Sequence, residues 1–343
     1  MGDSTASLKR KIGSAGDLLS VVRTMKAMAA SSVVQYENAV RSLEAYYRTV
    51  NLGLLACVHK NMPFAPAQAA NRDQSAVGAI VIGSDQGLVG QFNEVLVSFV
   101  NETLEKMPGQ KTVWAIGERI ESRLAETPFS SAESFVLPSS IGAITPLVGK
   151  ILLEMERHYE NGAISQVYIF HNCPKSGAIY VPVSQRLLPF DHDWQRDLLT
   201  TPWPTQSLPE VMNDRDQTLL SVLREYLFVS LFRACAESLA SENASRLAAM
   251  QRAEKNIDEL LEDLHQTFHR LRQSSIDEEL FDVISGFESL GKSKTGESSL
   301  KGYSNVTNRN NSRPRASYQP NNEVARTLRR KDHAGQIHVK QVR

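Results

Sequence analysis

A regular alternation of apolar residues through the first 57 positions constrains the fold of this chain more than any other feature. Spacings of four and three alternate, no proline interrupts them, and every position except Lys26 is apolar or amphipathic. A 3.5-residue repeat sustained this long is typical of a helix in a left-handed coiled coil. At 1.5 Å per residue the seam from Leu8 to Cys57 would run about 75 Å, and the helix is assigned to residues 1–58. The seam residues are Leu8, Ile12, Ala15, Leu19, Val22, Lys26, Ala29, Val33, Tyr36, Val40, Leu43, Tyr47, Val50, Leu54 and Cys57.

A second helix of the same kind is predicted near the other end, over residues 208–290. No proline follows Pro209 in this range, and the heptad alternation has one break, Glu254. Its seam is Leu247, Met250, Ile257, Leu261, Leu264, Phe268 and Leu271, with a weaker continuation through Ala240 and Asn243. Two such helices at opposite ends of one chain pair most simply as an antiparallel two-helix coiled coil.

The residues between the two helices have the sequence pattern of an α/β domain. The domain is assigned to residues 77–207, after a linker at 59–76. Strands are predicted at 77–82, 112–116, 135–137, 166–170 and 179–188, and helices at 91–106, 118–125 and 144–159. Strands that alternate with helices indicate a Rossmann-like domain with a largely parallel sheet. The fold class is therefore α/β plus coiled coil.

The last stretch, residues 291–343, is predicted to be a disordered basic tail. Apolar residues are sparse there, and twelve Lys or Arg stand against three Asp or Glu. Such a composition cannot bury enough apolar surface to order itself. The whole chain is balanced, with 38 basic and 38 acidic residues, so its net charge indicates neither nucleic acid nor an acidic membrane as a partner.

No active site, cofactor site or metal site is predicted. Cys57, Cys173 and Cys235 are far apart, as expected of single buried thiols. His265 and His269 share a helical face but have no evident third ligand, so a solvated face is favoured. The glycines of the turn at residues 83–90 do not fit G-x-G-x-x-G, and they indicate a tight turn with close helix–sheet packing.

Small residues cluster on both long helices, and two interpretations stay open. They are Ala27, Ala29, Ala30, Ser31 and Ser32 on the first helix and Ala240, Ser241, Ala244, Ser245, Ala248 and Ala249 on the second. They could allow close local packing, or form a slim outer face able to turn inside a sleeve. Glu242 and Arg246, four residues apart, are expected to form an exposed pair worth only a few tenths of a kcal/mol.

Near its end, the second helix carries an apolar stripe with no assigned partner. The stripe consists of Ile276, Leu280, Val283 and Phe287. An unpaired apolar tip favours a collar supplied by another protein. Packing against its own domain is the alternative.

Four motifs in order resemble the gamma subunit of F-type ATP synthases. Residues 237–250, ESLASENASRLAAM, are similar to E-x-L-A-S-E-x-A-x-R-x-x-A-M, and 272–280, RQSSIDEEL, resemble R-Q-x-x-I-T-x-E-L. Residues 24–31, TMKAMAAS, resemble the family's M-x-M-V-A-A-S stretch. Residues 84–93, SDQGLVGQFN, resemble S-D-R-G-L-C-G-x-x-N.

The resemblance implies a rotary, non-catalytic function. The coiled coil would be an axle inside a ring of alternating alpha and beta subunits, with the α/β domain against the epsilon subunit and the membrane rotor ring. Ion-driven rotation of that ring would then be coupled to ATP synthesis or hydrolysis on the beta subunits. Met25 and Lys26 would face the acidic lever loop of beta, where Lys9, Arg10, Lys11 and Arg23 add positive charge.

The resemblance also implies two further partner contacts. Arg246 and Gln273, with Glu242 and Asp277, would form a polar catch with beta, and the apolar tip from Ile276 to Phe287 would sit in a bearing. Asp277 departs from the family's threonine. Trp203 and Pro209 keep the spacing of the family's W-D-Y-L-Y-E-P stretch, but the aromatic and acidic residues between them are replaced.

The expected location is peripheral, on the cytoplasmic face of a bacterial or archaeal plasma membrane. No run reaches the ~20 apolar residues of a membrane span, so any membrane association comes through partners. Neither a transit peptide nor the cysteine-bearing insert of plastid relatives is recognised. The alternative function is a non-catalytic coiled-coil scaffold with an α/β module, which periodicity alone would predict.

Overall fold

The computed structural model describes residues 4–57, 76–175, 178–190, 192–207 and 214–294. The chain divides into two units, Met1–Glu279 and Leu280–Arg343. The elements are α1 (Thr5–Cys57), β1 (Val77–Ile82), α2 (Phe92–Glu105), β2 (Lys111–Ile116), α3 (Glu118–Leu124), β3 (Ser131–Phe135), α4 (Ile141–Glu160), β4 (Gln166–Lys175), β5 (Ala178–Leu188), α5 (His192–Thr200) and α6 (Arg215–Lys294).

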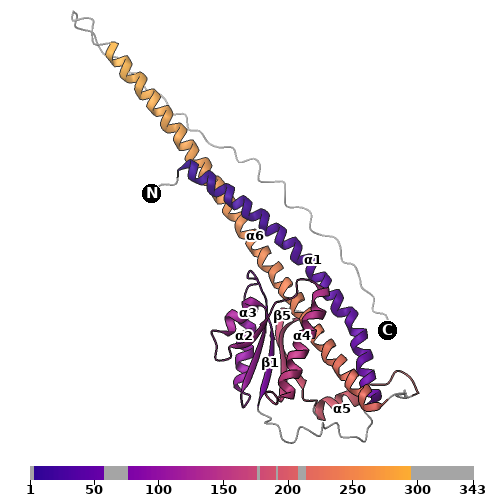
Figure 1. The fold of residues 1–343 in the computed structure, drawn as a ribbon. Coiled ribbons are helices and arrows are strands. Elements are labelled where there is room, and N and C mark those ends of the chain that lie inside the picture. Colours follow the sequence, from indigo (N-terminus) through magenta and orange to yellow (C-terminus); the bar gives the residue numbers. More distant parts are fainter. Residues whose placement is uncertain (1–3, 58–75, 176–177, 191, 208–213, 295–343) are drawn as a thin grey trace, which may run out of the picture. The chain divides into compact units, whose positions relative to one another are not determined.

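Helices α1 and α6 of the first unit pack side by side and run antiparallel (Figure 1). Cross-helix pairs fix the direction, because Lys26 bonds Glu254 whereas Tyr46 bonds Glu225 further along α1. All eight fully buried residues of α1 are predicted seam positions: Leu8, Leu19, Val22, Ala29, Tyr36, Val50, Leu54 and Cys57. The predicted antiparallel coiled coil is confirmed.

The α/β domain contains a five-stranded sheet in the order β3-β2-β1-β4-β5. Neighbouring strands are parallel except for β5, which pairs antiparallel with β4 as a hairpin. The central strand β1 is buried along its whole length, as expected of a strand covered on both faces. The prediction of a largely parallel, Rossmann-like sheet is therefore confirmed.

Alternate residues of β1 belong to two different cores. Val77, Ala79 and Val81 point to the side covered by α2 and α3. Ile80 and Ile82 point to the other side, where α4, α1 and α6 contribute to one continuous core. The coiled coil is thus part of the layer that covers one face of the sheet, which places the helix α6 directly against the end of β1.

Several element boundaries differ from those predicted. Strand β3 begins at Ser131, four residues before its predicted start, and α5 is absent from the predictions. Helix α5 is short, and it is held by packing of Trp194 and Leu198 on the core rather than by a local pattern. Helix α6 continues to Lys294, so the prediction of disorder is wrong for residues 291–294. The rest of the predicted tail lies outside the described residues, as do residues 208–213 and the predicted linker apart from Ala76.

Candidate functional site

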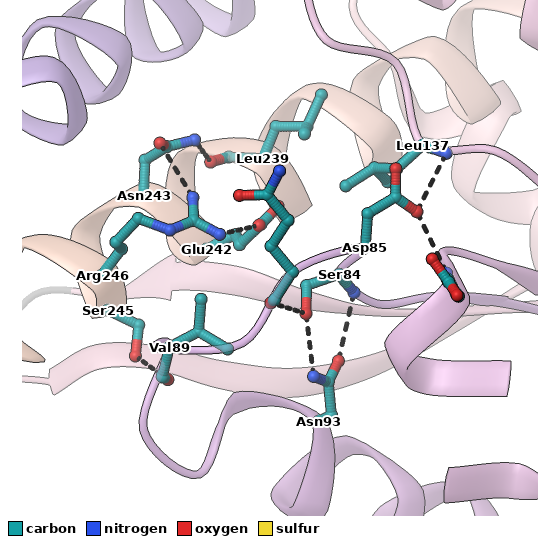
Figure 2. A network of polar contacts seen from close by, with 12 residues as sticks. Ser84, Asp85, Val89, Asn93, Leu137, Leu239, Glu242, Asn243, Ser245 and Arg246 are labelled. Atoms are coloured by element: carbon teal, nitrogen blue, oxygen red, sulfur yellow. Dashed lines mark hydrogen bonds and ion pairs between the residues drawn. The ribbon is translucent and has the colours of Figure 1, made fainter. Parts of the chain in front are cut away.

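The most polar part of the buried core lies where α6 crosses the loop that follows β1. Two serines of α6 donate to backbone carbonyls of this region: Ser238 Oγ to Ile82 O (3.2 Å) and Ser245 Oγ to Val89 O (2.6 Å, Figure 2). Ser241 and Ser245 are buried, and Ala240 is 2% exposed. Small side chains on α6 therefore serve close local packing with the α/β domain, and the outer-face interpretation is wrong for these residues.

The loop at residues 84–93 is held in one shape by its own hydrogen bonds. Asn93 Oδ1 accepts from the Ser84 backbone N–H (3.1 Å), and Asn93 Nδ2 donates to Ser84 Oγ (2.8 Å, Figure 2). Asp85 Oδ1 accepts from the backbone N–H groups of Glu118 (3.0 Å) and Leu137 (3.4 Å), which ties the ends of three strands together. These bonds fix the two ends of the loop, and Ser245 of α6 bonds the Val89 carbonyl between them.

Two glycines in this segment confirm the predicted turn chemistry. A Cβ on Gly83 would lie 2.2 Å from Cβ of Ile120 in α3, so only glycine fits there. Gly90 has a φ of +61°, in the left-handed region that favours glycine. The loop's glycines serve backbone packing.

Glu242 and Arg246 form a buried ion pair at the same junction. Arg246 Nη2 lies 2.5 Å from Glu242 Oε1, and the two side chains are 13% and 5% exposed. Arg246 also donates to Asn243 Oδ1 (3.3 Å, Figure 2). Burial raises the pKa of Glu242, and the nearby Asp85 adds to this, although Arg246 opposes it. The prediction of an exposed pair is wrong, because the α/β domain covers this stretch of α6.

A second polar cluster lies nearby, between α6, α1 and β4. Glu237 Oε2 pairs with His171 Nε2 (2.9 Å), and Glu237 Oε1 accepts from Arg233 Nε (2.7 Å). Burial alone would raise the pKa of Glu237, but hydrogen bonds from His171 and Arg233 hold it at about 2. Burial raises the pKa of the neighbouring Cys173 thiol to about 11, and Glu237 contributes to that rise.

The two polar breaks in the predicted seams meet each other in the coiled coil. Lys26 of α1 bonds Glu254 of α6, and Arg23 Nε lies 2.9 Å from Glu254 Oε1. Arg23 also reaches Asp258 at 3.5 Å. A polar layer of this kind fixes the register of a coiled coil. Met25 beside it is half-buried against a cluster of Leu19, Val22, Met250 and Ile257.

The structure does not bring the predicted partner-contact residues together. Glu242 and Arg246 lie at the junction, whereas Gln273 is exposed 27 residues further along α6, about 40 Å at 1.5 Å per residue. Asp277 is exposed as well. In the apolar stripe, Ile276 is 54% exposed, and Leu280, Val283 and Phe287 of the second unit are 57%, 56% and 74% exposed.

Among the described residues, one group of side chains could hold a metal ion: His171, Cys173 and Glu237. The sequence analysis missed it because Glu237 lies 64 residues after Cys173, which leaves no short-range pattern. His265 and His269 are both exposed, which confirms the predicted solvated face. None of the described helices combines the length and the apolar character needed to cross a membrane.

The fold and the junction together define a class of protein: an antiparallel two-helix coiled coil locked by buried polar contacts to an α/β domain. A protein-family model described as ATP synthase matches residues 4–290. The chain belongs to the ATP synthase gamma chain family. It is a gamma subunit, a non-catalytic component of the complex, and this excludes the alternative of an unrelated scaffold.

Curated relatives and solved structures agree with this assignment. The chain is 25% identical over 288 residues to the ATP synthase gamma chain of Polynucleobacter necessarius subsp. necessarius (strain STIR1), covering 82% of this chain and 98% of the relative. A gamma chain of Polynucleobacter asymbioticus is 24% identical over 289 residues. A chain of the Euglena gracilis mitochondrial ATP synthase shares the fold, with a TM-score of 0.59 at 14% identity, covering 87% of this chain and 98% of that one.

Proposed function

We propose that this gamma subunit is the rotating shaft of the complex, coupling ion-driven rotation of a membrane ring to ATP synthesis or hydrolysis on beta subunits. The observation that carries the proposal is the junction of α6 with the α/β domain. To transmit torque, the α/β domain, which the membrane ring would turn, must be firmly attached to the coiled coil, which would act on the beta subunits. Here Ser238 and Ser245 bond backbone carbonyls of that domain, and the domain covers the Glu242–Arg246 pair of α6.

The proposed contacts with beta lie at two heights along the coiled coil. Lys9, Arg10 and Lys11 are exposed about 22 Å before Met25 and Lys26 along α1. Because Lys26 and Arg23 pair with Glu254, these three exposed residues supply the positive charge that would complement an acidic loop of beta. Gln273 and Asp277 are exposed and available for a second, polar contact. Glu242 and Arg246 are buried and paired with each other, so we assign them an indirect part in the catch, in which they support the helix that presents these contacts.

The exposed apolar stripe of α6 is the proposed bearing. Four large apolar side chains at spacings of four, three and four are each more than half exposed. This spacing places them on one face of a helix. Exposed apolar area of this kind marks a protein-contact surface, and a collar of alpha and beta subunits would cover it.

The α/β domain is the proposed contact for the epsilon subunit and the membrane ring. Such contacts would hold the chain peripherally at the cytoplasmic face of the plasma membrane. Near the end of the domain, Trp203 Nε1 donates to Ser207 O (2.8 Å) and Thr205 Oγ1 (3.0 Å), which closes a local turn. This turn occupies the positions where the family's aromatic and acidic residues are replaced.

The test is co-expression with the alpha and beta subunits of the same organism, followed by an ATPase assay of the purified complex. We expect one copy of this chain per three alpha and three beta subunits, with hydrolysis that depends on the chain. Gln273→Ala with Asp277→Ala is expected to weaken coupling, whereas the exposed control Glu262→Ala is not. A folded chain that ignores alpha and beta would refute the proposal.

The basic tail at residues 291–343 is proposed to act as a tether or brake on acidic surfaces of the complex. Its charge, twelve basic against three acidic residues, is the observation that motivates this role. The complex with residues 295–343 deleted is expected to hydrolyse ATP faster and to lose latency. Unchanged hydrolysis and unchanged latency would refute this role alone.

A further inference from the structure

Three potential metal ligands from two elements converge beside the junction. His171 and Cys173 lie two residues apart in β4, so their side chains project from the same face of the strand. Glu237 reaches them from α6. One donor atom of each residue lies within 4.8 Å of the others. The side chains of His171 and Glu237 are 4% and 10% exposed, whereas Cys173 is half-buried, so the prediction of a buried thiol is wrong for Cys173.

The surrounding groups support metal binding. Glu237 Oε1 accepts from Arg233, whereas Oε2 points into the cluster and bonds His171 Nε2, a contact that a metal ion between the two would replace. His171 Nδ1 is buried without a partner among the described residues. The Nδ1 atom of His171 is therefore free to accept or donate one further bond. An Arg that holds the outer oxygen of a ligating carboxylate is typical of the supporting contacts around metal sites.

A cavity adjoins the three donors. Its volume is about 280 Å³, and its walls include Tyr47, Arg233 and Ser230 in addition to the cluster. A bound water occupies about 30 Å³, so the cavity has room for a metal ion and a water ligand. Tetrahedral zinc sites with bonds of about 2.0–2.3 Å place their donors about 3.5 Å apart. Here one donor pair is 2.9 Å apart and all three donors lie within 4.8 Å of one another, so side-chain movements would be needed to bring them to that spacing.

We propose that His171, Cys173 and Glu237 form a binding site for a divalent transition-metal ion of the zinc class, with water as the fourth ligand. Mixed imidazole, thiolate and carboxylate donors suit zinc better than magnesium or calcium. Thiolate and carboxylate neutralise the charge of the ion. The ion would cross-link β4 to α6, so its effect would be structural: it would strengthen the attachment of the α/β domain to the coiled coil.

The test is titration of the purified full chain with Co²⁺ under reducing conditions, followed by absorption spectroscopy and competition with Zn²⁺. We expect one Co²⁺ per chain, visible bands of tetrahedral intensity, a near-ultraviolet thiolate-to-cobalt band, and displacement by Zn²⁺. Cys173→Ser removes the thiolate band, and Glu237→Gln lowers affinity at least about tenfold. Cys57→Ser, a buried thiol outside the cluster, is the control and retains the band.

The unaltered chain alone can overturn the proposal. Co²⁺ that binds without a thiolate band, or no stoichiometric binding at all, refutes the site without any variant. A band that survives in folded Cys173→Ser also refutes it. As a second measurement, Zn²⁺ is expected to raise the melting temperature of the unaltered chain and a chelator to reverse the rise, and an unchanged melting temperature counts against the site. These readouts do not involve alpha or beta subunits and are independent of the proposed shaft function.

Discussion

Two charged contacts on α6 differ in burial, and the difference separates their roles. The Glu242–Arg246 pair is 5% and 13% exposed and lies under the α/β domain. The Lys26–Glu254 pair is 35% and 19% exposed and lies where only α1 and α6 meet. The first pair is local along one helix, and the second joins two helices. The first pair is therefore tied to the packing of the domain on α6, which buries it, and the second to the register of the coiled coil.

Burial also changes how each carboxylate titrates. Burial, with Asp85 adding to it, raises the pKa of Glu242 in spite of Arg246. Hydrogen bonds from Lys26 and Arg23 lower the pKa of Glu254. The same residue type thus destabilises the fold through desolvation at one site and gains stability from its ionised form at the other.

The largest effect is expected from Arg246→Met, which leaves Glu242 buried without its partner. Removal of one member of a buried ion pair costs about 3–5 kcal/mol. The pKa of Glu242 then rises further, so the folded state binds a proton more readily than the unfolded state. The loss of stability is therefore largest at neutral and alkaline pH and shrinks as the pH falls toward the ordinary range of a glutamate. Urea unfolding of the purified chain at several pH values measures this.

A double variant sharpens this comparison. Arg246→Met with Glu242→Leu removes both charges, and apolar replacement of a buried pair is often neutral or stabilising. We expect it to recover most of the stability that Arg246→Met loses, with no pH dependence from this site. A double variant as unstable as the single one would show that the pair is needed as such.

An intermediate effect is expected from Ser245→Ala, which removes the hydrogen bond to the buried Val89 carbonyl. Loss of one such bond with its acceptor left unsatisfied costs about 1–3 kcal/mol. Ser241→Ala is the matched control, because Ser241 Oγ is buried but has no partner among the described residues. Thermal unfolding of both variants checks the difference, and equal losses would contradict a role for the Ser245 contact.

The sequence predicts the coiled coil well and the junction poorly, for physical reasons. The seam from Leu8 to Cys57 follows a local repeat, so each position can be assigned without knowledge of the rest of the chain. The prediction that Glu242 and Arg246 are exposed is wrong, because no local sequence pattern indicates which stretch of α6 the α/β domain covers. Ser245 is predicted only as one of several small residues, and Ser238 is not among them. Their carbonyl partners, Ile82 at the end of β1 and Val89 after it, lie far earlier in the chain. Lys26 and Glu254 could have been paired, since each is the single polar break in its seam.

The smallest effect on stability is expected from Lys26→Met, because Glu254 keeps Arg23 as a partner at 2.9 Å. The partly exposed pair is screened by salt, so the variant's slightly lower melting temperature should approach that of the unaltered chain at high salt. The pKa of Glu254 is lowered in the fold, so its contribution is present above the ordinary glutamate pKa and is lost as the pH falls below it. Lys26→Met makes that loss of stability at low pH smaller.

The register of the coiled coil is the more sensitive readout of Lys26→Met. Disulfide trapping between cysteines placed at the exposed positions Ser20 and Asp258 should become less selective over neighbouring positions when Lys26 is replaced. Unchanged selectivity would show that Lys26 is not needed to set the register, and that the apolar seam with the remaining Arg23–Glu254 contact is sufficient.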